Sequence, residues 1–165
     1  MSGKETSAPA FAQVYAGASA TSNAGEQHSL WIDQQGNVYT SGNNDRGQLC
    51  LGGTEPFVNL PNQVSLKGPA VAAAIGEDFT LILLDDGSVY GCGSNEKGEL
   101  GLGNSVNSVD TPSNDNGLSN IIDLSAGLNH ALFQAANGNV YGTGSNIYMQ
   151  LCEFTDGEPV TTPKV

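Results

Sequence analysis

One spacing constrains the fold of this chain more than any other feature: glycines recur 51 residues apart, at Gly36, Gly87 and Gly138. Seven classes of position keep this step through three copies without an insertion. The first members of these classes are Gly25, Gly36, Tyr39, Gly42, Asn44, Leu49 and Pro61. A fixed period of this length indicates a repeat architecture, in which each copy is one supersecondary unit and stacked copies bury a shared core.

Each copy is predicted to consist of short strands joined by tight turns. In the second copy, residues 71–75 and 79–84 are apolar runs, and residues 88–93 form a further segment typical of a strand. Residues 85–87 join the last two as a hairpin, because glycine tolerates positive φ and aspartate caps turn amides. In the first copy the corresponding first strand, 20–24, is polar. A period near 50 residues with about four strands and no helical pattern predicts β-propeller blades.

The composition narrows the range of partners. The net charge is −12, from five Lys and Arg against seventeen Asp and Glu. Such a surface repels phosphate backbones and anionic membranes, so we expect no nucleic-acid or membrane binding and a protein partner, in particular one with a basic surface. The chain has no run of about 18 apolar residues and its N-terminus lacks the apolar core of a signal peptide. We therefore expect a cytoplasmic protein, with nuclear or cytoskeletal association left open.

The second copy resembles one repeat of the regulator of chromosome condensation family in five segments. They are GEDFTL (76–81), DGSVY (86–90), GSN (93–95), GELGLG (98–103) and TP (111–112). With its counterparts in the other copies, this likeness runs from about residue 14 to residue 165. It implies an all-β fold of three four-stranded antiparallel β-propeller blades, as an incomplete or assembled propeller.

Two departures from the family pattern affect single positions. The family often has tryptophan just before the glycine of the third strand, where this chain has Ser41, Cys92 and Thr143. In the third copy, Met149 replaces the loop glycine, so its outer loop is expected to be altered.

The repeats divide the chain into three blades and a short lead. Residues 1–13 are expected to be a tail or a closing strand for the last blade, and the three blades follow at 14–64, 65–115 and 116–165. Because propellers close with about four to eight blades, three blades leave two apolar faces uncovered. The chain is then a segment of a longer protein, pairs with a second copy into a six-bladed ring, or docks as an arc in a large complex.

No set of residues predicts a catalytic, cofactor or metal site. His28 and His130 occupy equivalent places two copies apart and are interpreted as structural residues that bond their own blade's turns. Cys50, Cys92 and Cys152 are expected to be reduced thiols, and Cys50 and Cys152 to serve as small buried apolar side chains. Since no Cys-x-x-Cys pair or calcium loop occurs, no metal is expected.

The variable stretches between strands are the best candidates for partner contacts, because loops on a rigid scaffold carry recognition. In these stretches we select Glu55, Phe57, Asp110 and Asp115. The favoured function is a non-catalytic protein-interaction module or a structural subunit of a larger assembly, not an enzyme. Two alternatives follow from the family resemblance: guanine-nucleotide exchange on a small GTPase, and inhibition of an enzyme.

Overall fold

The computed structural model describes residues 11–16, 28–53, 55–153 and 155–165, and these residues form twelve strands. The strands are β1 (Phe11–Ala16), β2 (His28–Asp33), β3 (Val38–Asn43), β4 (Phe57–Gln63), β5 (Ala70–Ile75), β6 (Phe79–Leu84), β7 (Val89–Ser94), β8 (Ser108–Ser113), β9 (Ile121–Ala126), β10 (His130–Ala135), β11 (Val140–Gly144) and β12 (Val160–Lys164). Among the described residues, no helix is long and apolar enough to cross a membrane.

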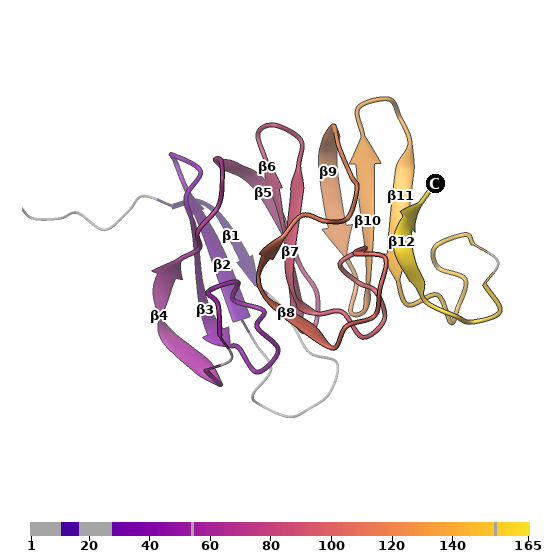
Figure 1. Cartoon of the computed structure of the whole chain (residues 1–165). Coiled ribbons are helices and arrows are strands. Elements are labelled where there is room, and N and C mark those ends of the chain that lie inside the picture. Colours follow the sequence, from indigo (N-terminus) through magenta and orange to yellow (C-terminus); the bar gives the residue numbers. More distant parts are fainter. Residues whose placement is uncertain (1–10, 17–27, 54, 154) are drawn as a thin grey trace, which may run out of the picture.

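The strands form three four-stranded antiparallel sheets, which confirms the predicted fold class. Blade 1 is β1–β4, blade 2 is β5–β8 and blade 3 is β9–β12, each in sequence order. The blades stand side by side in this order, and β5 packs beside β1 on one side and beside β9 on the other (Figure 1). The first strand of each blade is therefore the inner one, as in a propeller.

The three blades share the same strand register, including one irregularity that occurs in each of them. In each blade the pairing of the first and second strands shifts by one residue near its far end, between Phe11 and Gln13, between Ala70 and Ala72, and at Gln134. Each hairpin between the second and third strands turns on a glycine with positive φ, such as Gly87 at 79°. The backbone follows the 51-residue period because the same turn residues recur at the same spacing.

The first strand differs from the expectation in its position. β1 begins at Phe11, three residues before the predicted boundary at residue 14. It pairs with β2 in the register that β5 has with β6, so it belongs to blade 1 and does not close blade 3. The segment 20–24, which we expected to be this strand, lies outside the described residues.

Two apolar cores lie between the blades. The residues that fill the seam between blades 1 and 2 are Leu30, Ile32, Val38, Cys50, Val64, Ala70, Ala73, Ile82, Leu84, Tyr90 and Cys92. Those around the seam between blades 2 and 3 are Ala74, Phe79, Leu81, Leu83, Val89, Leu100, Ile121, Leu124, Ala131, Phe133 and Ala135. Burying each large side chain contributes about 1.5–3 kcal/mol, so the seams supply most of the driving force for folding.

The burial pattern shows which sheet faces are covered. All six residues of β6 are buried, because blade 2 has a neighbour on both faces. In β10 buried residues alternate with more exposed ones, because only one face of blade 3 is covered. The uncovered face explains why β10 follows the period of two that a half-buried strand requires.

Candidate functional site

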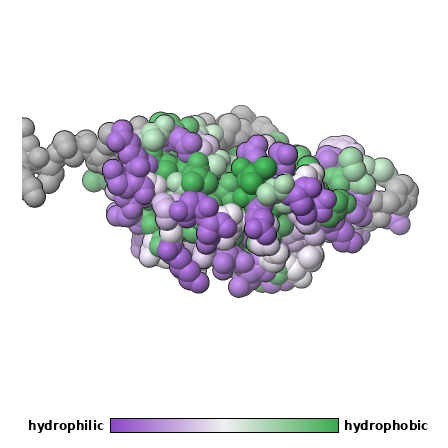
Figure 2. Space-filling model, turned by 90° about the horizontal axis from the view of Figure 1, so that it is seen from above, coloured by the Kyte–Doolittle hydropathy of each residue, from purple (hydrophilic) through white to green (hydrophobic). Residues whose placement is uncertain are grey.

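Three long loops gather at one end of the molecule, here called the long-loop end. They join the third and fourth strands of each blade and comprise residues 44–56, 95–107 and 145–159. The tight hairpin turns between the second and third strands lie at the opposite, short-turn end (Figure 1). Seen from the short-turn end, hydrophobic residues gather in the middle between hydrophilic ones (Figure 2).

An asparagine at the start of each long loop fixes its shape. The Oδ1 atoms of Asn44, Asn95 and Asn146 each accept a hydrogen bond of 3.0 Å from the backbone N–H of the leucine five residues later. Their Nδ2 atoms donate to backbone carbonyls late in the loop at 2.9, 3.1 and 2.7 Å. The asparagines are almost fully buried, so these bonds replace bonds to water and hold the loops in one conformation.

A second side chain caps the tip of each loop. Gln48, Glu99 and Gln150 accept a hydrogen bond from the backbone N–H two residues earlier, at 2.9, 2.9 and 3.0 Å. Burial raises the pKa of the Glu99 carboxyl above its ordinary value, because the charged form loses its hydration. The loops thus share one scaffold and differ at their outermost residues.

The tips themselves differ sharply in chemistry. In blades 1 and 2 they are charged, and Arg46 Nη1 forms an ion pair with Glu96 Oε1 at 2.9 Å. In blade 3 the tip is apolar: Ile147, Tyr148 and Met149 are 62%, 84% and 51% exposed. We refer to these three residues as the blade 3 tip.

A hollow of about 550 Å³ lies beside the blade 3 tip, between the loops of blades 2 and 3. Its wall includes Glu96 and Lys97 from blade 2, and Ile147 and Glu158 from blade 3. It has room for one or a few side chains of another molecule, and it offers both signs of charge next to an apolar wall.

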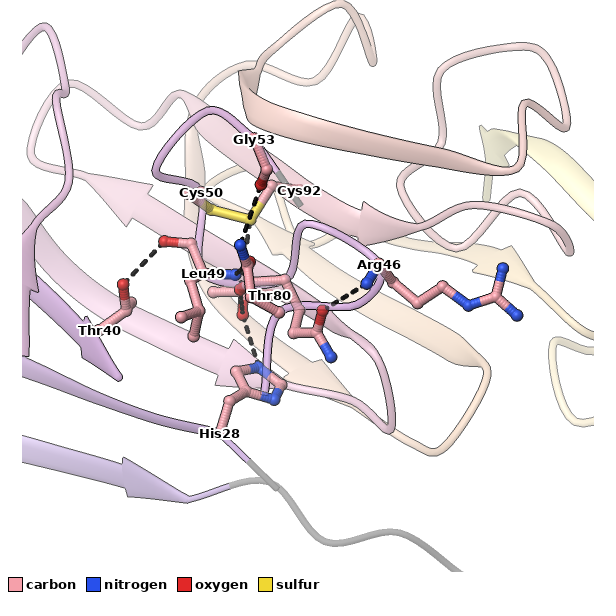
Figure 3. The surroundings of a disulfide bond; sticks show 10 residues. His28, Thr40, Arg46, Leu49, Cys50, Gly53, Thr80 and Cys92 are labelled. Atoms are coloured by element: carbon pink, nitrogen blue, oxygen red, sulfur yellow. Dashed lines mark hydrogen bonds between the residues drawn. A yellow bond between two sulfur atoms is a disulfide. The ribbon is translucent and has the colours of Figure 1, made fainter. Parts of the chain in front are cut away.

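Polar contacts across the seam between blades 1 and 2 position the blade 1 loop (Figure 3). The backbone oxygen of Gln48 accepts a hydrogen bond of 2.8 Å from Thr80 Oγ1. Since the Thr80 proton is used there, Thr80 Oγ1 accepts the 2.8 Å bond from His28 Nε2. His28 therefore bonds the neighbouring blade, not a turn of its own blade as we expected, and burial lowers its pKa to about 4.

Two cysteines cross-link the same seam, and the expectation of reduced thiols is wrong for them. Cys50 and Cys92 form a disulfide with Cα atoms 5.4 Å apart (Figure 3). Cys50 has a left-handed φ of 59°, and Gly101 takes the same place in blade 2. A Cβ at Gly101 would lie 3.0 Å from Cγ2 of Thr143, the counterpart of Cys92, so this loop position points at the third strand of the next blade. Cys152, expected to be buried, is exposed.

The four residues selected from the sequence do not form one site. Glu55 and Phe57 are exposed at the long-loop end, with Phe57 at the start of β4. Asp110 serves the scaffold, because its Oδ2 accepts a 2.9 Å bond from Gly53 N and clamps the blade 1 loop to β8. Asp115 follows β8 toward the short-turn end, where Ser113 Oγ lies 3.4 Å from its Oδ2.

Sequence reasoning did not select the blade 3 tip, although the sequence contained one indication of it. The replacement of the loop glycine by Met149 was visible as a departure from the repeat, but the exposure of Ile147 and Tyr148 needed the structure. Among the described residues, no three His, Cys, Asp or Glu side chains come together in a way that could hold a metal ion.

Comparisons with known proteins agree with this geometry. The model of the regulator of chromosome condensation (RCC1) repeat matches residues 35–83 and 86–134, and a second model of the repeat matches residues 70–99 and 121–150. The chain is 38% identical over 135 residues to Protein RCC2 homolog of Xenopus laevis, covering 79% of this chain and 26% of that protein. It is 36% identical over 125 residues to the secretion-regulating guanine nucleotide exchange factor of Bos taurus, covering 74% and 27%.

The likeness extends to solved structures. The crystal structure of Prp20p from Saccharomyces cerevisiae superimposes with a TM-score of 0.76 at 23% identity, over 86% of this chain and 36% of that one. The chain spans about a quarter of the length of the curated relatives given above. Because the repeat model covers more than half of the sequence and each copy folds as one four-stranded blade, the chain belongs to the regulator of chromosome condensation (RCC1) repeat family.

Proposed function

We propose that this chain is a non-catalytic protein-binding module that meets its partner through the long-loop end. The observation that carries the proposal is the shared loop scaffold with different tips: the bonds of Asn44, Asn95 and Asn146 are the same, whereas the outermost residues change from blade to blade. A rigid frame with variable tips is the arrangement that recognition loops use. A relative of the same fold supports a protein partner, since yeast Prp20p is described with its binding to Gsp1p and histones.

An affinity capture with two matched variants tests the proposal. In the tip variant, six tip residues become serine: Asp45, Arg46, Glu96, Lys97, Ile147 and Tyr148. In the control variant, six residues of the short-turn hairpins become serine: Gln34, Gln35, Asp85, Asp86, Ala136 and Asn137. Proteins retained from an extract of the source organism by the wild type and by the control are expected to be lost with the tip variant. Equal retention by all three proteins would rule out the long-loop end as the binding surface.

Guanine-nucleotide exchange is a second candidate, because relatives named as exchange factors are 36% and 31% identical to this chain. The test is the release of a fluorescent GDP analogue from a panel of small GTPases in the presence of the purified chain. Accelerated release from one GTPase would replace the non-catalytic proposal. An unchanged rate with the whole panel would leave the binding module as the better account.

A further inference from the structure

The blade 3 tip is held outward by a rigid backbone. Met149 N donates 2.9 Å to the Asn146 carbonyl, Tyr148 N donates 3.0 Å to Gln150 Oε1, and Cys152 N donates 3.1 Å to the Met149 carbonyl. These bonds repeat those of the charged tips, so they fix the backbone that carries Ile147 and Tyr148. A single exposed apolar residue is ordinary, but three in succession on a fixed loop mark an interaction surface.

Met149 also bears on whether a further blade could pack on this tip with the geometry of the other two seams. In blades 1 and 2 the position holds glycine: a Cβ at Gly47 would lie 2.6 Å from the Cα of Asp110, and one at Gly98 would lie 2.7 Å from the Cα of Thr161. Those backbone atoms belong to the outer strand of the next blade. A blade seated on blade 3 with the same geometry would bring its outer strand equally close to the Cβ of Met149, which disfavours that arrangement.

The charge pattern along the tips breaks at blade 3. Arg46 of the first tip pairs with Glu96 of the second, so the same step would pair Lys97 with residue 147. That residue is Ile147, and it lines the 550 Å³ hollow together with Lys97. An apolar side chain stands where the pattern calls for a carboxylate, next to space for a side chain from another molecule.

The rest of the blade 3 loop is acidic. Residues 145–159 contain the carboxylates of Glu153, Asp156 and Glu158 and no lysine or arginine, whereas the loops of blades 1 and 2 each contain one basic residue. Glu158 lines the hollow together with Lys97 and with Glu96, and Glu96 is already paired with Arg46. A partner that buries the apolar tip therefore meets a loop of net negative charge, which favours basic side chains by charge complementarity.

From these observations we propose that the blade 3 tip is a docking knob for a segment of a partner protein that carries both apolar and basic side chains. The apolar side chains of the segment pack on Ile147, Tyr148 and Met149, and its lysines or arginines face the carboxylates of the blade 3 loop. Tyrosine suits this role, because it buries a large area and loses little side-chain entropy on binding. The inference rests on the proposed protein-binding function and adds which loop binds and what chemistry it selects.

Binding of three defined synthetic peptides, measured by fluorescence anisotropy, tests the proposal. One peptide alternates lysine with leucine, the second alternates lysine with serine, and the third alternates glutamate with leucine. The lysine–leucine peptide is expected to bind at least about tenfold more tightly than either of the others, since only it supplies both the anchor and the charge. Equal binding of the lysine–serine peptide would show that charge alone acts, and would overturn the proposal.

A matched variant assigns the binding to the tip. The double variant Ile147→Glu, Tyr148→Lys installs the charged tip of blade 2 on the same backbone, so the fold is retained and circular dichroism melting verifies it. Its affinity for the lysine–leucine peptide is expected to fall about tenfold or more. The control Gln34→Lys, Gln35→Glu, which makes the same charge-neutral change at the exposed hairpin of blade 1 on the short-turn end, is expected to bind as the wild type does. Unchanged affinity in the double variant would refute the knob.

The same double variant separates the two proposals in the affinity capture. If it retains the natural partners that the six-residue tip variant loses, the module binds through other tips and only the knob fails. If the six-residue tip variant also retains them, the proposed function fails as well.

Discussion

His28 lies buried in the seam between blades 1 and 2, and its protonation is expected to set the acid sensitivity of the fold. Nε2 donates to Thr80, and Nδ1 has no hydrogen-bond partner among the described residues. A second proton would put a charge in a buried seam, which is why burial lowers the pKa to about 4 from 6.5. The unfolded chain takes up this proton at higher pH than the folded chain. The contribution of His28 to the free energy of unfolding is therefore fully present above pH 6.5 and is lost as the pH drops toward 4.

The variant His28→Phe is expected to remove that pH dependence, because Phe79 holds the same place in blade 2 and is fully buried. The free energy of unfolding of the wild type, measured with urea, should fall by up to about 3 kcal/mol between pH 7 and pH 4, because folding lowers the pKa of His28 from 6.5 to about 4. The variant should show a much flatter profile in this range. Parallel profiles for the two proteins would mean that other groups cause the acid sensitivity.

Glu99 is a buried carboxylate at a position where the other blades use an amide. Burial raises its pKa above 4.5, so the folded state holds the proton more tightly than the unfolded state and loses stability as the pH rises through the raised pKa. Glu99→Gln keeps a side-chain oxygen that accepts the hydrogen bond from the backbone N–H of Lys97. Gln48 and Gln150 accept the equivalent bonds in the other two blades. We expect the variant to melt at a higher temperature than the wild type at pH 7 and at about the same temperature below pH 4.5. A lower melting temperature at pH 7 would show that the charge itself is needed.

The disulfide between Cys50 and Cys92 sets the seam of blades 1 and 2 apart from the next seam. Between blades 2 and 3 the same two places hold Gly101 and Thr143, and Thr143 Oγ1 donates 2.9 Å to the Glu99 carbonyl. The double variant Cys50→Gly, Cys92→Thr therefore copies the second seam onto the first. With a sequence separation of 42 between the cysteines, we expect the variant to fold and its free energy of unfolding to fall by roughly 2–4 kcal/mol.

Thermal melting with and without dithiothreitol measures this contribution. The reductant should lower the melting temperature of the wild type toward that of the double variant and should leave the variant unchanged. A wild type that ignores the reductant, while its thiols become open to alkylation, would show that the cross-link adds nothing to the stability of the seam.

At the level of strands, the sequence predicted the elements that recur in every copy and missed the elements that occur in one copy only. The 51-residue step sufficed for the three blades and their hairpins, because turn glycines and apolar runs recur with it. It placed the first strand of blade 1 at residues 20–24, whereas the pairing strand is β1, because extra residues between β1 and β2 interrupt the step. The disulfide was also invisible, since Cys50 and Cys92 occupy non-equivalent positions and only the seam brings them together.

The whole molecule carries an apolar face at each end of the row of blades. On blade 3, Leu132 and Val140 are 37% and 48% exposed, whereas their counterparts Leu81 and Val89 in blade 2 are fully buried. On blade 1, the partly exposed Trp31 corresponds to Ile82, which is also fully buried. Sheet faces of this kind favour stacking of a second copy, blade 3 on blade 1, and two copies would supply the six blades of a closed ring.

Met149 is expected to oppose that stacking, because a Cβ at the equivalent Gly47 or Gly98 would come within 2.7 Å of the outer strand of the next blade. We therefore expect the wild type to have the mass of one chain in light scattering at every concentration tested. The variant Met149→Gly, which restores the glycine found at residues 47 and 98, should approach the mass of two chains as its concentration rises. Trp31 is the only tryptophan, so its emission should shift to the blue in the variant as the face of blade 1 becomes covered.

A doubled mass for the wild type would mean that the outer strands part enough to admit Met149, and the tip would then lie inside an interface between copies. A single-chain mass for both proteins would mean that the sheet faces are too weak to associate even without the obstacle. If the variant forms a dimer and the wild type does not, Met149 is the residue that prevents ring closure and keeps the tip open. Met149 has a left-handed φ of 57°. Methionine costs about 1–2 kcal/mol in that conformation relative to glycine, so its presence there is explained if an open tip is what the molecule requires.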